Sequence, residues 1–165
     1  MTGTEDQIMK LLRNVKDPEI PVLDVVEMGI VRHVHFEPDG AVRVDITPTY
    51  SGCPAMHVIR EDIVRALHDG GFEDIEVHTV FDEAWSTEWM TEEARTKLSA
   101  YGIAPPGRLD ENDGLLPLLR EESALACPFC GSNHTRLTSA FGATACKSLH
   151  FCEDCRQPFE HFKCI

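Results

Sequence analysis

The sequence predicts an α+β fold, in which a mixed domain of helices and strands precedes a small cysteine-rich module. Apolar residues recur at helical spacing in two segments, and they alternate with a period of two in others, as in half-buried strands. Two Cys-x-x-Cys pairs lie near the end of the chain. The expected order is therefore helix, β-hairpin, helix and strand, followed by the cysteine pairs.

The first helix is expected over residues 5–15. Its apolar positions fall on one face: Ile8, Leu11, Leu12 and Val15. The motif Asp17-Pro18-Glu19-Ile20-Pro21 ends this helix, because each proline disfavours helical geometry in the residue before it. The two acids of this stiff loop, Asp17 and Glu19, are candidates either for turn capping or for contact with a metal or a partner.

A β-hairpin is expected next, with strands over residues 30–36 and 41–47. The turn between them, Glu37-Pro38-Asp39-Gly40, has proline and glycine at favourable positions. The buried face of the second strand is formed by alternating residues: Val42, Val44 and Ile46.

The second helix ends near Asp69, because Gly70-Gly71 follows it. A third strand begins at Ile75. The irregular segment after it contains both tryptophans, Trp85 and Trp89, which either fold over a core or form a surface for a partner. The core interpretation is the favoured one. A short helix over residues 92–100 completes the first domain.

The stretch from Thr47 to Met56 connects the second strand to the second helix and contains the first cysteine, Cys53. Pro54 suits the first helical position, where its missing N–H is not needed. Cys53 would then lie at or near the N-cap, where unpaired N–H groups and the helix dipole favour a thiolate. The alternative is a small buried cysteine that packs as an apolar side chain. The spacing alone leaves both interpretations open.

The composition is that of a globular protein: 165 residues, with 42% hydrophobic and 26% charged residues. No apolar run has the length needed to span a membrane, and the first residues lack the basic and apolar regions of a signal peptide. We therefore expect a cytoplasmic protein, in which clustered cysteines more often bind metal than form disulfides.

The net charge of −13 is spread unevenly over the expected domains. Residues 1–105 hold 9 Lys and Arg against 20 Asp and Glu, whereas residues 126–165 hold 4 against 3. Residues 106–125, rich in proline, acids and leucine, are the expected linker. Nucleic-acid binding normally needs a basic surface, so the charge argues against that class of function.

The cysteine pairs Cys127-Pro128-Phe129-Cys130 and Cys152-Glu153-Asp154-Cys155 are separated by 21 residues. This is close to the spacing of a four-thiolate zinc site, in which each short turn presents two sulfurs to a tetrahedral ion. So short a module cannot bury enough core alone, and a metal would supply much of its folding free energy. Zinc is the expected ion, although iron could use the same ligands.

Five further residues of this module could surround a metal site: His134, Cys146, His150, His161 and Cys164. The histidines could replace a ligand or lie around the site, but the two cysteine pairs need none of them. The remaining two cysteines either pack as thiols or approach each other.

Several motifs together resemble a known family over nearly the whole chain. The loop Asp17-Pro18-Glu19-Ile20-Pro21, the strand entry at Gly29 and the stretch from Thr47 to Pro54 resemble the small iron–sulfur assembly domain shared with SufT-type proteins. The tail is similar to that of PaaD (also called PaaJ) proteins of the bacterial phenylacetic acid degradation cluster. Its matching motifs are Phe141-Gly142, Thr144-Ala145-Cys146-Lys147 and residues 159–165.

The resemblance implies a two-layer, iron–sulfur-cluster-assembly-like domain followed by a small β zinc ribbon. It also implies a role with the monooxygenase that epoxidises the ring of phenylacetyl-CoA, whose oxygenase and reductase subunits are then the expected partners. Cys53 is the candidate cluster-transfer thiolate, with Asp17 and Glu19 nearby in the family's domain. A transient iron–sulfur cluster is the expected cargo, beside a structural zinc in the tail.

The sequence carries no Glu-x-x-His pair of the di-iron type and no glycine-rich dinucleotide fingerprint. We therefore expect an accessory protein for iron–sulfur assembly or maturation and not a catalyst. Two alternatives stay open: a structural subunit of that monooxygenase, and a zinc-ribbon regulator of nucleic acid, which the acidic charge disfavours. The sequence leaves open whether the chain forms a homo-oligomer.

Overall fold

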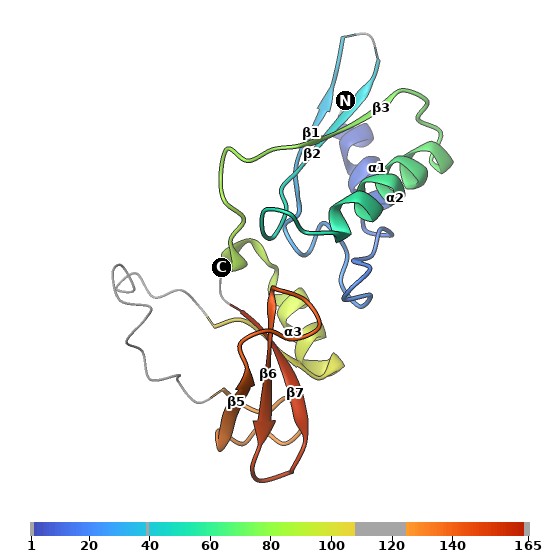
Figure 1. The fold of residues 1–165 in the computed structure, drawn as a ribbon. Helices are drawn as coiled ribbons and strands as arrows, with labels where there is room; N and C mark the ends of the chain where they lie inside the picture. Colours follow the sequence, from blue (N-terminus) through green and yellow to red (C-terminus); the bar gives the residue numbers. More distant parts are fainter. Residues whose placement is uncertain (1, 39, 108–124, 164–165) are drawn as a thin grey trace. The chain divides into compact units, whose positions relative to one another are not determined.

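The structure is a computed structural model that describes residues 2–38, 40–107 and 125–163. The chain divides into two compact units, Met1–Ala94 and Arg95–Ile165. Figure 1 shows the elements of each. No helix within the described residues is long and apolar enough to cross a membrane.

The first unit consists of a three-stranded sheet with two helices on one of its faces (Figure 1). The strand order is β1-β2-β3. The helices and strands have these bounds: α1 Thr2–Leu12, β1 Val31–Phe36, β2 Val42–Ile46, α2 Ala55–Asp69 and β3 Ile75–Thr79. This two-layer α+β arrangement confirms the predicted fold class and the predicted order of elements.

Helix α1 ends at Leu12, three residues before the expected end at residue 15. The chain beyond it tightens into turns in which Asn14 and Val15 donate to the carbonyls of Leu11 and Leu12, both at 3.0 Å. Such i to i+3 bonds satisfy carbonyls that the end of an α-helix leaves unpaired. Val15 is buried together with Leu12, so the apolar stripe continues past the helix.

Strands β1 and β2 pair antiparallel as the expected hairpin, while β3 pairs parallel to β2. Helix α2 forms the crossover between the two parallel strands, which such a connection requires. Its buried residues face the sheet: Ala55, Ile59, Ile63 and Leu67. They pack with the predicted face of β2, whose residues Val42, Val44 and Ile46 are all at most 1% exposed.

The segment that follows β3 covers the strand entry at Gly29. Trp85 is 2% exposed, and its indole N–H donates to the carbonyl of Met28 at 3.0 Å. Trp89 lies in the short 3₁₀ helix η1, Thr87–Trp89, with the guanidinium carbon of Arg32 3.4 Å from its ring centroid. Trp85 therefore folds over the core, as the favoured interpretation of the tryptophan segment predicted.

The second unit contains a four-stranded sheet with the order β4-β7-β6-β5. Helix α3 precedes it. The bounds are α3 Glu92–Tyr101, β4 Ile103–Ala104, β5 Thr135–Ser139, β6 Lys147–Cys152 and β7 Pro158–Phe162. Strands β5, β6 and β7 form an antiparallel ribbon, and β4 joins β7 in the parallel direction.

The division between the compact units falls inside α3, before the expected domain end at residue 105. Ile103 and Ala104 pair with Glu160 and His161 of β7, so this short strand belongs to the ribbon's sheet. The bounds 1–105, 106–125 and 126–165 stay a prediction about which parts fold independently. Most of the expected linker, residues 108–124, lies outside the described residues.

We predict that Gly29→Ala destabilises the first unit more than Gly71→Ala does. Both glycines have positive φ, of 72° and 93°, so alanine at either site costs about 1–2 kcal/mol in backbone conformation. A Cβ on Gly29 would also lie 2.7 Å from Cβ of Trp89, whereas one on Gly71 would meet no atom within 4 Å. We expect Gly29→Ala to cost about 1–3 kcal/mol more.

The measurement is urea unfolding followed by tryptophan fluorescence, because both tryptophans lie in the first unit. Equal losses of stability in the two variants would contradict the close approach of Trp89 to Gly29.

Candidate functional site

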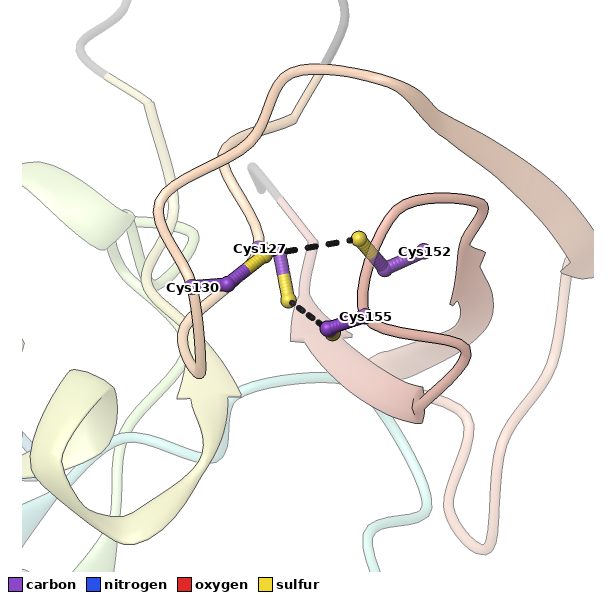
Figure 2. Close-up of side chains that lie close together, drawn as sticks. All are labelled: Cys127, Cys130, Cys152 and Cys155. Carbon is purple, nitrogen blue, oxygen red and sulfur yellow. Dashed lines mark hydrogen bonds between the residues drawn. The ribbon is translucent and has the colours of Figure 1, made fainter.

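The four paired cysteines converge in the second unit, as the sequence predicted (Figure 2). Their sulfurs, from Cys127, Cys130, Cys152 and Cys155, all lie within 4.8 Å of one another. The Cys127–Cys155 pair is separated by 3.7 Å and the Cys130–Cys152 pair by 3.6 Å. Four sulfurs at about 2.3 Å from a tetrahedral ion would be about 3.8 Å apart. The geometry therefore fits a four-thiolate metal site.

Each cysteine pair lies in a tight turn that the backbone closes in the same way. In the first cysteine turn, residues 127–131, the N–H of Gly131 donates to the carbonyl of the first cysteine at 2.8 Å. In the second cysteine turn, residues 152–156, the N–H of Arg156 does so at 3.0 Å. Gly131 and Arg156 both have positive φ, of 74° and 63°.

Arg156 is the only non-glycine residue with positive φ within the described ranges. Non-glycine residues adopt this conformation at an energetic cost, so it occurs where the surrounding structure requires it. Glycine adopts positive φ readily, whereas an arginine after the second cysteine pair gives no sequence signal for such a turn. The structure shows that both turns present their sulfurs by the same backbone geometry.

Two of the sulfurs form part of the hydrophobic core of the second unit. Cys127 and Cys152 are 2% and 0% exposed, and they pack with Ala104 of β4 and Phe159 of β7. Cys155 packs against this cluster, whereas Cys130 is exposed. Two of the four buried residues of this cluster are candidate ligands, so the metal site and this part of the fold depend on each other.

Backbone hydrogen bonds make one of these thiols more acidic than an ordinary cysteine. The N–H groups of Cys155 and, to a lesser extent, Asp154 lower the pKa of Cys152 to about 7. A coordinated dication deprotonates a thiol outright, so a bound metal would hold all four groups as thiolates. Such a site has no open position for a substrate, which is typical of a structural metal.

The three histidines of the ribbon do not join the four-sulfur group. His134 contacts Asp154, with 3.2 Å between its Nδ1 atom and a carboxylate oxygen. His150 and His161 meet at the Ser148 hydroxyl, at 3.0 and 3.4 Å. Of the remaining cysteines, Cys146 is buried beside the Thr144 hydroxyl at 3.0 Å, and Cys164 lies outside the described residues.

His161 is a half-buried histidine whose environment favours the neutral form. Burial lowers its pKa to about 4, with smaller contributions from His150 and Lys163. Its Nε2 atom is buried and has no hydrogen-bond partner among the described residues. Protonation would therefore place an uncompensated charge in the ribbon.

Cys53 lies in the first unit, just before helix α2. Pro54 occupies the N-cap with φ of −67°, and no side chain caps the helix. Of the two interpretations that the spacing left open, the direction of the Cys53 pKa favours the packed, neutral thiol. Burial raises the pKa of this half-buried thiol more than the N–H of Ala55 lowers it, and the negative charge of Glu19 raises it further. The raised pKa favours the neutral form of the Cys53 thiol.

Two hydroxyl-bearing residues that the sequence interpretation missed also contact Cys53. The side chains of Thr49 and Tyr50 form hydrogen bonds that lower the thiol's pKa. Both lie in the stretch between β2 and α2, but nothing in its spacing showed which residues would turn toward the sulfur. Together with the N–H of Ala55, they would stabilise a thiolate once its proton has left.

The two candidate acids have different places around Cys53. Glu19 is close enough to act on the thiol through its charge. Asp17 is 6% exposed, and its Oδ1 atom accepts hydrogen bonds from the backbone N–H groups of Glu19 and Ile20, both at 2.8 Å. Asp17 therefore caps the loop that carries Glu19, which is the turn-capping role that the sequence left open.

We predict that the second unit loses stability between pH 6.5 and 4 and that His161→Gln reduces this loss. The folded-state pKa of His161, about 4, is below its ordinary value of 6.5. The unfolded chain therefore takes up a proton first as the pH falls, which favours unfolding until the folded form is protonated as well. Glutamine carries no such proton.

The measurement is urea unfolding at several pH values between 7.5 and 4, followed by the amide NMR signals of β6 and β7. Protonation of the cysteines affects both proteins, so the difference in slope between wild type and variant isolates His161. Equal slopes would contradict a buried, neutral His161.

Comparison with protein families matches each unit of the chain. The family model described as an iron-sulfur cluster assembly protein matches residues 5–79. The model described as the PaaD zinc beta ribbon domain matches residues 113–163 and includes all four paired cysteines. The two matches support metal binding by the ribbon and an assembly-type first unit.

Two relatives and one solved structure extend these matches. An Escherichia coli (strain K12) protein, whose name designates a subunit of a "Putative 1,2-phenylacetyl-CoA epoxidase", is 45% identical over 96% of this chain and 92% of its own length. Bacillus subtilis YitW, named an Fe-S protein maturation auxiliary factor, is 35% identical over 57% of this chain and 92% of its own. A DUF59 domain from Bacillus anthracis superposes with a TM-score of 0.55 at 29% identity, over 59% of this chain and 92% of that one.

The first-unit resemblance thus extends to separate maturation factors, whereas the Escherichia coli protein matches both units. The resemblance drawn from the Asp17 loop, the Cys53 stretch and the tail motifs is confirmed. This chain belongs to the PaaD family, in which an iron–sulfur cluster assembly domain is followed by a zinc beta ribbon domain.

Proposed function

We propose that this chain is an accessory protein of phenylacetate catabolism that assists iron–sulfur cluster assembly or maturation of the phenylacetyl-CoA ring-epoxidising monooxygenase. The observation that carries the proposal is the Cys53 site in a unit that matches the iron–sulfur cluster assembly family. The ribbon, together with the relative named for the epoxidase, supports this enzyme as the client. The oxygenase and reductase subunits are then the partners, and the cytoplasm is the location.

Cys53 is the proposed transient ligand of the cluster, which is cargo and not a resident cofactor. A thiol must lose its proton to bind iron. Thr49, Tyr50 and the Ala55 N–H are placed to stabilise the resulting thiolate. Glu19 offers a carboxylate beside the sulfur, and Asp17 holds the loop that carries Glu19.

The ribbon is proposed to hold one structural zinc ion on its four paired cysteines. The closed four-sulfur set supports retention and not transfer, because no coordination position is left open. Iron in the same tetrahedral set is the chemical alternative. The chain would thus carry two sulfur sites with different tasks: one resident metal in the ribbon and one transient cargo at Cys53.

A structural subunit of the monooxygenase is the second candidate function. It is favoured by the name of the Escherichia coli relative, which refers to a component of the epoxidase. A subunit co-purifies with the oxygenase at fixed stoichiometry through size exclusion, whereas a maturation factor leaves it once the cluster is in place. The same run measures whether this chain forms homo-oligomers. Regulation of nucleic acid is the weakest candidate, because the net charge is −13.

We predict one zinc ion per chain, bound by the paired cysteines and measured by elemental analysis of protein purified without oxygen. Cys127→Ser and Cys152→Ser should release the metal and unfold the second unit, because both sulfurs also belong to its core. The matched control is Cys146→Ser, which changes a buried thiol outside the four-sulfur group. A metal-free chain with a protease-resistant ribbon would contradict this assignment, and iron in place of zinc would change the ion only.

We predict that Cys53→Ser abolishes support of ring epoxidation in cells while the protein stays folded. The exchanged atom is small and only half buried, so the free energy of unfolding should change by about 1 kcal/mol or less. The measurements are growth on phenylacetate, abundance of the oxygenase subunits and the melting temperature. Full growth with the serine variant would remove Cys53 from the mechanism.

Thr49→Val and Thr49→Ser form a matched pair at the same site. Valine removes the hydroxyl that lowers the pKa of Cys53, whereas serine keeps it. Site-resolved alkylation of Cys53 should therefore need a higher pH in the valine variant than in the serine variant. Identical alkylation profiles would show that the hydroxyl of Thr49 does not act on the sulfur.

A further inference from the structure

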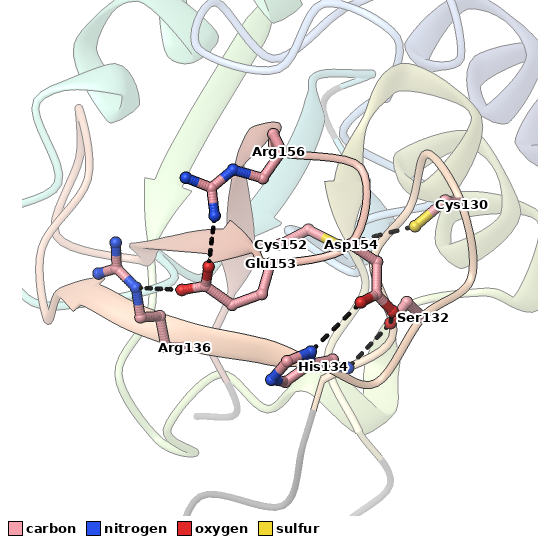
Figure 3. A network of polar contacts seen from close by, with 8 residues as sticks. All are labelled: Cys130, Ser132, His134, Arg136, Cys152, Glu153, Asp154 and Arg156. Carbon is pink, nitrogen blue, oxygen red and sulfur yellow. Dashed lines mark hydrogen bonds and ion pairs between the residues drawn. The ribbon is translucent and has the colours of Figure 1, made fainter.

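Three polar side chains connect the two cysteine turns on their outer side (Figure 3). Ser132 and His134 follow the first turn in the chain, while Asp154 lies inside the second. The Ser132 hydroxyl donates to one carboxylate oxygen of Asp154, and His134 Nδ1 lies 3.2 Å from the other. Each carboxylate oxygen of Asp154 therefore contacts a residue that follows the first cysteine turn. We call these three residues the cross-turn network.

The same residues contact the ligand sulfurs through their backbone. The N–H of Ser132 forms a hydrogen bond with the sulfur of Cys130, and the N–H of Asp154 forms one with the sulfur of Cys152. These two sulfurs are the pair separated by 3.6 Å. The backbone N–H groups of Ser132 and Asp154 thus each bond one candidate ligand sulfur, and the side chains of the two residues bond each other.

The Ser132 side chain also orders its own turn. Its hydroxyl accepts a hydrogen bond from the N–H of His134 at 3.0 Å, and its carbonyl accepts one from the N–H of Cys127 at 2.8 Å. The backbone adds one more bond between the turns, from the N–H of Glu153 to the carbonyl of His134 at 2.9 Å. Separation of the two turns would therefore break side-chain and main-chain bonds together.

We propose that Asp154 is a positioning residue that retains the metal of the ribbon, because it joins the two cysteine turns through Ser132 and His134. The proposal rests on the metal site of the proposed function. A metal ion leaves a four-sulfur site when one turn moves away from the other and frees its sulfurs. Bonds between the turns oppose this movement, and residues around metal ligands commonly change metal affinity by about 10–100-fold when mutated.

The exposure of these side chains indicates where the effect should be largest. Asp154 and His134 are 57% and 73% exposed, and exposed ion pairs add little to equilibrium stability. Their contribution should therefore be sought in the rate of metal release and not in the melting temperature. A release rate reports the separation of the turns directly.

Glu153 supplies a matched control within the same turn. It carries the same charge as its neighbour Asp154, and it also makes two ion pairs, with Arg136 Nε at 2.7 Å and with Arg156 Nη1 at 2.8 Å (Figure 3). Arg156 belongs to the same turn as Glu153, and Arg136 lies in β5, beyond the cross-turn network. Glu153→Ala therefore removes an acid beside the metal ligands but leaves the cross-turn network in place.

The experiment uses the full chain loaded with one equivalent of zinc and measures release to an excess of a chromogenic chelator. Asp154→Ala should release zinc about tenfold faster than wild type, while Glu153→Ala should stay within about twofold. Asp154→Asn keeps one oxygen that can accept the Ser132 hydrogen bond, so its rate should fall between those of wild type and the alanine variant.

A double-mutant cycle tests whether the effect passes through Ser132. Ser132→Ala should speed release by itself, and the double variant with Asp154→Ala should release zinc more slowly than the product of the two single effects requires, because the two residues share one bond. Independent effects that multiply would overturn the network, as would equal rates for Asp154→Ala and Glu153→Ala.

Two further outcomes separate this proposal from the metal site on which it rests. If Asp154→Ala loses its zinc during purification, the release rate of Ser132→Ala becomes the test. A wild-type release rate in Ser132→Ala would overturn the proposal. If the wild-type chain binds no zinc or iron at all, the metal site fails and the positioning role fails with it. Zinc binding with release rates unchanged in all variants overturns only the role of Asp154.

Discussion

The convergence of four cysteine sulfurs within 4.8 Å is the constraint on which the second unit depends. Thiolates at such distances repel one another unless a cation lies between them. The buried core around them is small, formed by Ala104, Cys127, Cys152 and Phe159. Since two of these four residues are proposed ligands, metal binding would be coupled to the formation of this cluster.

This dependence also explains the backbone of the ribbon. Both cysteine turns end at a residue with positive φ, Gly131 in one and Arg156 in the other. An arginine in that conformation is strained, and the strain is sustained because the turn must present two sulfurs in one direction. The short strand β4 extends the arrangement, since Ala104 reaches the sulfur cluster through its pairing with β7.

The sulfur of Cys53 has a different environment from the four in the ribbon. It is a single, half-buried thiol beside a carboxylate, and the core of the first unit is complete without it. Burial and the charge of Glu19 keep it protonated, while Thr49, Tyr50 and the Ala55 N–H offer hydrogen bonds to a thiolate. This difference supports the proposed separation of tasks, in which the ribbon retains its metal and Cys53 exchanges its cargo.

The sequence by itself determined the order and kind of the elements and singled out the four cysteines that converge. Apolar periodicity, the glycines that end α2 and the spacing of the cysteine pairs are local properties, so they can be read without a fold. The tertiary structure alone decided the acidity of Cys53, because the helix start acts locally whereas the burial and the charge of Glu19 come from elsewhere in the chain. It also decided the pairing of the two-residue strand β4 and the contact between Ser132 and Asp154, 22 residues apart. A strand of two residues has no period, and a contact across a metal site exists only after the chain has folded around it.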